Sequence, residues 1–121
     1  MSVADFSPGD IVLIEHRPLD DPSTVKPRPA IIISSSAFNK GNIDVVVAAI
    51  SSVIRHGDPK QIIIQDSDPG FPQTGLKMTS VVKCGAVFAY PKSLIRRRLG
   101  KAPGDVLAQV RKFMAEFLTN D

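Results

Sequence analysis

An arginine and a pair of serines in the first half of the sequence have the chemistry to bind and activate a phosphate. Arg28 directly precedes one apolar, β-branched run, and Ser51-Ser52 ends a second one. A guanidinium offers paired, permanently charged donors, and a hydroxyl adds a further donor or acceptor. Such groups stabilise the charge that builds on a phosphodiester when the neighbouring ribose 2′-OH attacks it. These residue types therefore suit metal-free RNA cleavage, although a surface ion pair and a plain strand end remain open as alternatives.

The elements that carry these residues are predicted to place them side by side. The runs 29–35 and 43–51 read as two strands of a hairpin, since the Asn and Gly residues between them favour a reversal near residue 40. A residue i on the first strand then faces a residue near 80 − i, which brings Arg28 level with Ser51 or Ser52. Opposed residues on antiparallel strands lie about 5 Å apart. The proline-rich segment 17–28 reads as a long loop over the same end, either a binding loop or a plain surface connection.

The remaining pattern predicts a mostly β fold with one C-terminal helix. Further strands are expected at 11–16, 61–65 and 79–90, the last broken near Gly85. After Pro103-Gly104 the apolar spacing changes to that of one helix face, which we expect to pack as core over the sheet. That face comprises Val106, Leu107, Val110, Phe113, Met114, Phe117 and Leu118. About five short strands and one helix indicate a small, strongly curved sheet or partly closed barrel, in a single domain over residues 1–121.

Composition excludes several other classes of protein. The chain has 121 residues, 43% of them hydrophobic and 22% charged, as in ordinary globular proteins. A single cysteine, Cys84, rules out an intramolecular disulfide and a thiolate metal site, and it reads as buried apolar filler. We find no zinc-type spacing, no Gly-rich phosphate loop and no G-x-S-x-G motif. We therefore expect no metal or other cofactor. With no leader pattern and no apolar run near 20 residues, we expect a cytoplasmic protein without a membrane segment.

The charge is distributed unevenly along the chain. The formal net charge is +3, yet residues 83–112 contain eight basic residues and a single acidic one, Asp105. The basic residues are Lys83, Lys92, Arg96, Arg97, Arg98, Lys101, Arg111 and Lys112. Such asymmetry favours an anionic partner, nucleic acid or an acidic peptide, with a solvated basic face as the alternative.

Three motifs in order connect these residues to a known family. Residues 8–13 (PGDIVL), 28–34 (RPAIIIS) and 45–51 (VVVAAIS) together resemble the MazF/PemK (Kid) toxin family. The resemblance implies an SH3-like barrel of the CcdB/MazF type, a homodimer, and an endoribonuclease toxin of a type II toxin–antitoxin pair. Such an enzyme cuts single-stranded RNA at short sequences, leaves 2′,3′-cyclic phosphate and 5′-OH ends, and is neutralised by an antitoxin with an acidic C-terminal segment.

The resemblance also assigns roles to residues of this sequence. The family's catalytic arginine, which acts in proton transfer and phosphate stabilisation, matches Arg28, and its strand-end threonine matches Ser51. We predict these two as catalytic. As RNA-binding residues flanking them we predict Arg17, Lys26, Ser52 and His56.

Other interpretations and departures from the family pattern are visible in the same residues. His16 and His56 are candidates for an acid and a base, but we rank them below the arginine mechanism because exposed loop histidines are common. Serine replaces the usual threonine at Ser51, and Lys83-Cys84-Gly85 stands where relatives carry an acidic residue and a glutamine. The alternative function is a non-catalytic binding module of the same fold, either a degenerate toxin or a CcdB-like gyrase-binding toxin.

Overall fold

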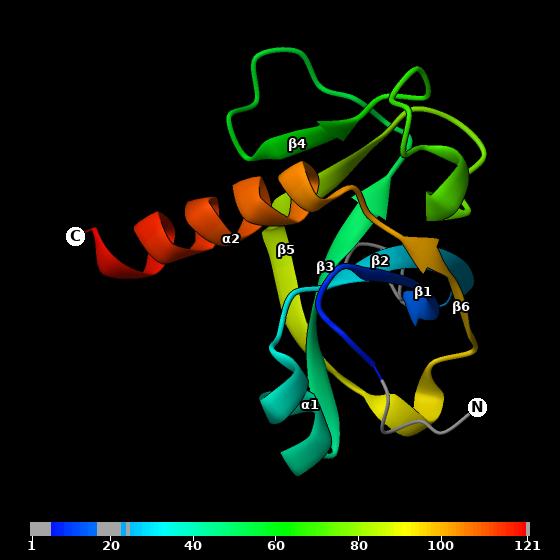
Figure 1. Cartoon of the computed structure of the whole chain (residues 1–121), viewed down its shortest axis with the longest axis vertical. Coiled ribbons are helices and arrows are strands. Elements are labelled where there is room, and N and C mark those ends of the chain that lie inside the picture. The colour runs from blue at the N-terminus through cyan, green and yellow to red at the C-terminus, as the bar shows by residue number, and fades with distance from the viewer. Residues whose placement is uncertain (1–5, 17–22, 24, 121) are drawn as a thin grey trace.

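The computed structural model describes residues 6–16, 23 and 25–120. In this part of the chain six antiparallel strands form one sheet in the order β4-β5-β3-β2-β1-β6 (Figure 1). The strands are β1 (Asp10–His16), β2 (Lys26–Ile32), β3 (Asp44–Ser51), β4 (Gln61–Ile64), β5 (Ser80–Pro91) and β6 (Arg97–Lys101). The helices are α1 (Ser36–Gly41) and α2 (Gly104–Thr119), with short 3₁₀ helices η1 (Pro72–Thr74) and η2 (Lys92–Leu94). The predicted mostly β class with a C-terminal helix is confirmed.

The central strands are apolar on both faces because both faces are covered. Ile11 and Ile31 pack in one cluster with Val106 of α2, whereas their chain neighbours Val12 and Ala30 belong to a second cluster on the other side. Successive strand residues point to opposite faces, so burial on both sides requires an unbroken apolar run. In Figure 1 β1, β2 and β6 cross the long strands β3 and β5 steeply, which makes the sheet strongly curved.

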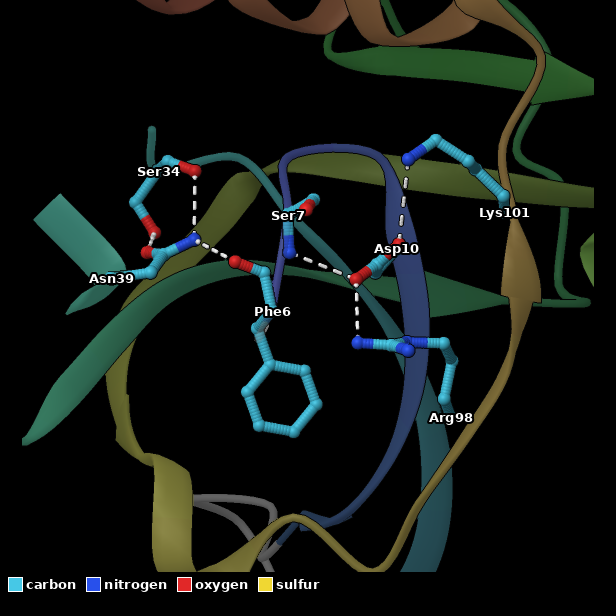
Figure 2. A network of polar contacts seen from close by, with 7 residues as sticks. All are labelled: Phe6, Ser7, Asp10, Ser34, Asn39, Arg98 and Lys101. Carbon is cyan, nitrogen blue, oxygen red and sulfur yellow. Dashed lines mark hydrogen bonds and ion pairs between the residues drawn. The ribbon is translucent and has the colours of Figure 1, made fainter. Parts of the chain in front are cut away.

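The connection between β2 and β3 is the short helix α1 and not a reversal built on left-handed Asn and Gly residues. Ser35 caps the N-terminus of α1 with its side chain. Asn39 is fully buried, and its amide donates to the backbone oxygens of Phe6 at 3.0 Å and Ser34 at 3.1 Å (Figure 2). The predicted reversal near residue 40 is present, but the expected left-handed Asn and Gly residues were wrong. A capped helix with a hydrogen-bonded asparagine satisfies the backbone without them.

The pairing of β2 with β3 is nevertheless close to the predicted one. The partners are Ala30 with Ala49, Ile31 with Ala48, and Ile32 with Val47. This register differs by one residue from the prediction. β2 begins at Lys26, earlier than the predicted start at residue 29. Continued along both strands, the register places Arg28 level with Ser51.

A bulge interrupts β5 where the sequence predicts a break. Ala48 pairs with Val87, but the next residue of β3, Ala49, pairs with Lys83. Residues 84–86 are therefore extra on the β5 side, with Gly85 at their centre. The predicted break near Gly85 is confirmed.

Strand β6 was not predicted, because its sequence is strongly charged. It pairs with β1, and this pairing carries an ion-pair network between the two strands (Figure 2). The buried carboxylate of Asp10 lies 3.1 Å from Arg98 and 3.6 Å from Lys101, and it accepts a hydrogen bond from the Ser7 N–H. The Arg98 guanidinium also lies 5.3 Å from the centre of the Phe6 ring. Arg98 and Lys101 are accommodated in this strand because both pair with the buried carboxylate of Asp10.

Helix α2 covers one face of the sheet only with its first half. Val106 and Val110 are buried, whereas Phe117 and Leu118 are 63% and 72% exposed. Figure 1 shows the C-terminal end of α2 projecting beyond the strands. The expectation that the whole apolar stripe packs as core is therefore wrong for its last turn, since no strand lies beneath it. Within the described residues, no helix has the length and apolar character needed to cross a membrane.

Candidate active site

Arg28 and Ser51 line the same two cavities. The first cavity, of about 390 Å³, lies between β1, β2, β6 and the segment 75–80. The second cavity, of about 300 Å³, lies between β2, β3 and the bulge of β5. Four residues line both cavities and form the wall that they share: Arg28, Pro29, Ile50 and Ser51. The structure therefore brings together the two residues that were predicted to act as a pair.

Both cavities are lined by basic residues, serines and aliphatic side chains. Lys77 and Arg97 add positive charge to the first cavity, and Lys83 adds it to the second. Among the described residues, no His, Asp or Glu lines either cavity. Arg28 is exposed and makes no ion pair with any described residue. The site therefore offers donors and positive charge to an anion, and it lacks the paired carboxylates of acid–base hydrolases.

Ser51 is held in place by the chain that follows it. Its Oγ accepts a hydrogen bond of 3.0 Å from the backbone N–H of Val53. This is a local serine turn, which forms readily where a strand ends. The hydroxyl proton remains available to a further acceptor. The half-buried Ser51 can thus donate its hydroxyl proton to a group bound in the cavities while the Val53 N–H holds its oxygen in place.

Two glycines bring the far wall of the first cavity into position. Gly75 has a φ of 74°, and a Cβ there would lie 2.2 Å from the Leu99 carbonyl oxygen. A Cβ on Gly100 would lie 2.1 Å from the carbonyl oxygen of Gln73. Only glycine permits so close an approach of backbone to backbone. The η1 segment therefore lies directly against β6, which places Leu76 beside the cavity.

The predicted RNA-binding residues divide into three groups. Ser52 lines the first cavity together with Arg28 and Ser51. Lys26 and His56 are exposed, and neither lines the two cavities. Arg17 and most of the predicted loop lie outside the described residues. Of the three that the structure describes, it groups Ser52 with the candidate catalytic pair and leaves Lys26 and His56 apart from it.

Comparison with known proteins identifies the family. The sequence matches the model of the PemK-like, MazF-like toxins of type II toxin–antitoxin systems over residues 7–118. The chain belongs to this toxin family. The resemblance inferred from three sequence motifs is thereby confirmed. No sequence match to a functionally curated protein was found.

Solved structures show the same fold. A mycobacterial endoribonuclease in complex with its cognate antitoxin matches with a TM-score of 0.74 and 18% identity, covering 96% of this chain and 97% of the other. A MazE–MazF structure from Deinococcus radiodurans gives 0.73 and 22% identity, with the same two coverages of 96% and 97%. The Mycobacterium tuberculosis toxin MazF-mt6 gives 0.69 and 20% identity, covering 93% and 98%. The fold is therefore that of the MazF toxins.

Sequence reasoning missed the cations that line the cavities of this toxin-family member. Lys77 was not singled out, Arg97 entered only as part of a basic stretch, and Lys83 entered there and as a departure from the family pattern. Much of that stretch is structural, since Arg96 pairs with Glu15 at 2.8 Å in addition to the contacts of Arg98 and Lys101 with Asp10. Recognition of β6 as a strand would have separated Arg97 from its neighbours, because adjacent strand residues face opposite ways.

Cys84 lines neither of the two cavities. Cys84 is 3% exposed, as the packing interpretation predicted, and burial raises the pKa of its thiol from 9.0 to about 11. It is thus a protonated, unreactive thiol at neutral pH. In the described part of the chain, no three His, Cys, Asp or Glu side chains gather as metal ligands do.

Proposed function

We propose that this chain is a sequence-specific endoribonuclease toxin that cleaves single-stranded RNA without a metal ion. The products would carry 2′,3′-cyclic phosphate and 5′-OH ends. One observation carries the proposal: Arg28 and Ser51, from neighbouring strands, line the same two basic cavities. Membership of the PemK/MazF toxin family supports it, as do the endoribonucleases among the similar structures.

The proposed reaction follows from the donors at the site. The ribose 2′-oxygen attacks the adjacent phosphorus and loses its proton to water, while the bond from phosphorus to the 5′-oxygen breaks. The guanidinium of Arg28 is a cation with several N–H donors, so it can bind the non-bridging oxygens and donate a proton to the departing 5′-oxygen. Solvent then reprotonates Arg28. The hydroxyl of Ser51 donates to a phosphate oxygen while its own oxygen is held by the Val53 N–H.

Hydrogen-bond donors at the reacting phosphate raise the rate of cleavage by amounts that can be estimated. A donor placed where charge develops contributes about 10²- to 10³-fold in rate. Arg28 acting as such a donor, a smaller contribution from the Ser51 hydroxyl and a strand held in a fixed position would together give a substantial acceleration without a metal. The absence of a carboxylate or histidine from the lining of the described cavities fits a reaction driven by stabilisation of charge.

The partners and the compartment belong to the same proposal. A positively charged toxin suits an antitoxin with an acidic C-terminal segment, because such a segment can occupy a cationic site. The printed descriptions of similar structures include complexes with antitoxins. We also propose a homodimer in the cytoplasm.

The test is cleavage of a mixed-sequence RNA by the purified protein in excess EDTA. We expect cuts at a recurring short sequence, and the cut ends should carry 5′-OH groups and cyclic phosphates. Loss of cleavage in EDTA with recovery in Mg²⁺ would overturn the metal-free mechanism. Tight RNA binding without any cleavage would instead support the non-catalytic binding module.

A further inference from the structure

A third cavity, of about 290 Å³, opens beside the bulge of β5. It is lined by Arg55, Asp58, Lys60, Gln61, Lys83, Gly85 and Ala86. None of the functions proposed above uses it. Three of its seven lining residues are cations, contributed by the β3–β4 connection and by β5.

Each cation is held near the others by a backbone contact. The side-chain amide of Gln61 accepts from the Arg55 N–H at 3.1 Å and donates to the Arg55 carbonyl at 2.5 Å. Gln61 in turn pairs with Lys83 across β4 and β5. The carbonyl of Lys60 accepts a 2.9 Å hydrogen bond from the N–H of Cys84. The grouping is therefore a product of the fold and not of three independent surface chains.

The charge of the third cavity is not compensated. Asp58 is the only acidic residue in its lining, and its carboxylate lies 3.8 Å from the Lys60 ammonium. Arg55 and Lys83 form no ion pair with any described residue. Three cations and one carboxylate leave an excess of two positive charges. Such a site attracts an anion, and the planar guanidinium suits a phosphate in particular.

The third cavity continues the candidate active site. Lys83 and Ala86 line both the second and the third cavity, and the second cavity contains Arg28 and Ser51. Gly85 lies in the bulge and lines the third cavity, and a Cβ there would come into ordinary contact, 3.6 Å, with the Lys60 side chain. Because Gly85 and Ala86 have little or no side chain, this side of the third cavity leaves room for an extended ligand. One ligand can therefore contact all three cavities in succession.

We propose that the third cavity is a second phosphate-binding subsite for the RNA strand, formed by Lys83, Arg55 and Lys60. The inference rests on the proposed function and extends it. A strand whose scissile phosphate lies at Arg28 must continue to either side, and it carries a phosphate at every linkage. RNA fits this track better than an acidic peptide, because the subsite adjoins the reacting groups. Lys83 then positions the strand, and Arg55 and Lys60 bind the neighbouring phosphate.

The test compares Lys83→Met and Arg55→Gln with wild type. Affinity is measured for a mixed-sequence 2′-O-methyl RNA, which cannot be cleaved, at several salt concentrations. We expect weaker binding in both variants and a salt dependence of log K that is less steep by about 0.7 per lost phosphate contact. In cleavage assays of Arg55→Gln, which lies outside the first two cavities, KM should rise while kcat stays near wild type. Lys40→Met, on exposed α1, is the matched control and should change nothing.

The outcomes separate this inference from the function on which it rests. An inactive wild type that does not bind RNA would overturn the proposed function. A wild type that cuts RNA, with unchanged KM and salt dependence in both variants, would overturn the subsite alone. The subsite would also be overturned if both variants bound RNA like wild type but no longer bound a glutamate-rich peptide. That result would assign the third cavity to an acidic protein partner.

Discussion

The hydroxyl oxygen of Ser51 accepts a hydrogen bond from the backbone N–H of Val53, at 3.0 Å. This contact fixes the oxygen and leaves the hydroxyl proton free to donate to a phosphate. Ser51→Ala should therefore slow cleavage by about two- to tenfold, the value of one hydrogen bond of about 0.5–1.5 kcal/mol. Ser51→Thr keeps the hydroxyl and stiffens its rotamer, so its rate should equal or exceed that of wild type.

The measurement for Ser51 is single-turnover cleavage at saturating protein. Ser93→Ala, an exposed position in η2, serves as the control and should not change the rate. Equal rates for Ser51→Ala and wild type would remove the serine from the mechanism.

The guanidinium of Arg28 should matter more than the serine. Arg28→Ala should lower the cleavage rate by about 10²- to 10³-fold or more, because charge on the reacting phosphate loses its main donor. Arg28→Lys should remain far below wild type, since an ammonium keeps the charge but loses the paired donors. Thermal unfolding should be unchanged, because Arg28 is exposed. Unimpaired cutting by Arg28→Ala would contradict the proposed mechanism.

The two glycines behind the first cavity should tolerate no side chain. Gly100→Ala forces a Cβ to within 2.1 Å of a backbone oxygen, and Gly75→Ala adds an unfavourable φ of 74°. Each should destabilise the fold by roughly 2 kcal/mol or more, as measured by urea unfolding. In Gly104→Ala the new Cβ meets nothing within 4 Å, so that control should be neutral or slightly stabilising. Wild-type stability in Gly100→Ala would contradict the close docking of η1 on β6.

The network around Asp10 should stabilise the pairing of β1 with β6. Asp10→Ala removes the buried carboxylate that contacts both Arg98, whose side chain is 31% exposed, and Lys101. We expect a loss of about 2 kcal/mol in the free energy of unfolding. Asp66→Ala, at an exposed position, should change the stability by less than about 0.5 kcal/mol. A similar value for both variants would show that the network contributes little.

Cys84 should make stability depend on pH in the alkaline range. Burial raises the pKa of its thiol to about 11 from an ordinary value of 9.0. The folded state therefore holds this proton more tightly than the unfolded state, so the contribution is complete below pH 9 and is lost as the pH rises towards 11. Urea unfolding between pH 8 and 11 should show a smaller decline in Cys84→Ala than in wild type. Parallel curves for the two proteins would contradict a buried, protonated thiol.

The sequence by itself determined the fold class, the family and the two residues of the proposed catalytic pair. Long apolar runs with β-branched residues indicated buried strands, and the change of period after Pro103 indicated α2. These signals are local and repeat over many residues, so they survive errors at any one position. The β2–β3 register was predicted to within one residue even though the connection proved to be α1, because both strands are anchored by apolar residues on both faces.

Only the tertiary structure decided which charges belong to the site. Arg97 lines the first cavity, while its neighbour Arg98 is bound to Asp10, and a count of basic residues treats the two alike. Lys83 reaches two cavities because a bulge of β5 lies opposite β3, a relation between segments far apart in the chain. Whether a charged residue lines a cavity or forms an ion pair depends on its distance from residues on other strands. Sequence periodicity does not give these distances, because they follow only once every strand, β6 included, has been paired.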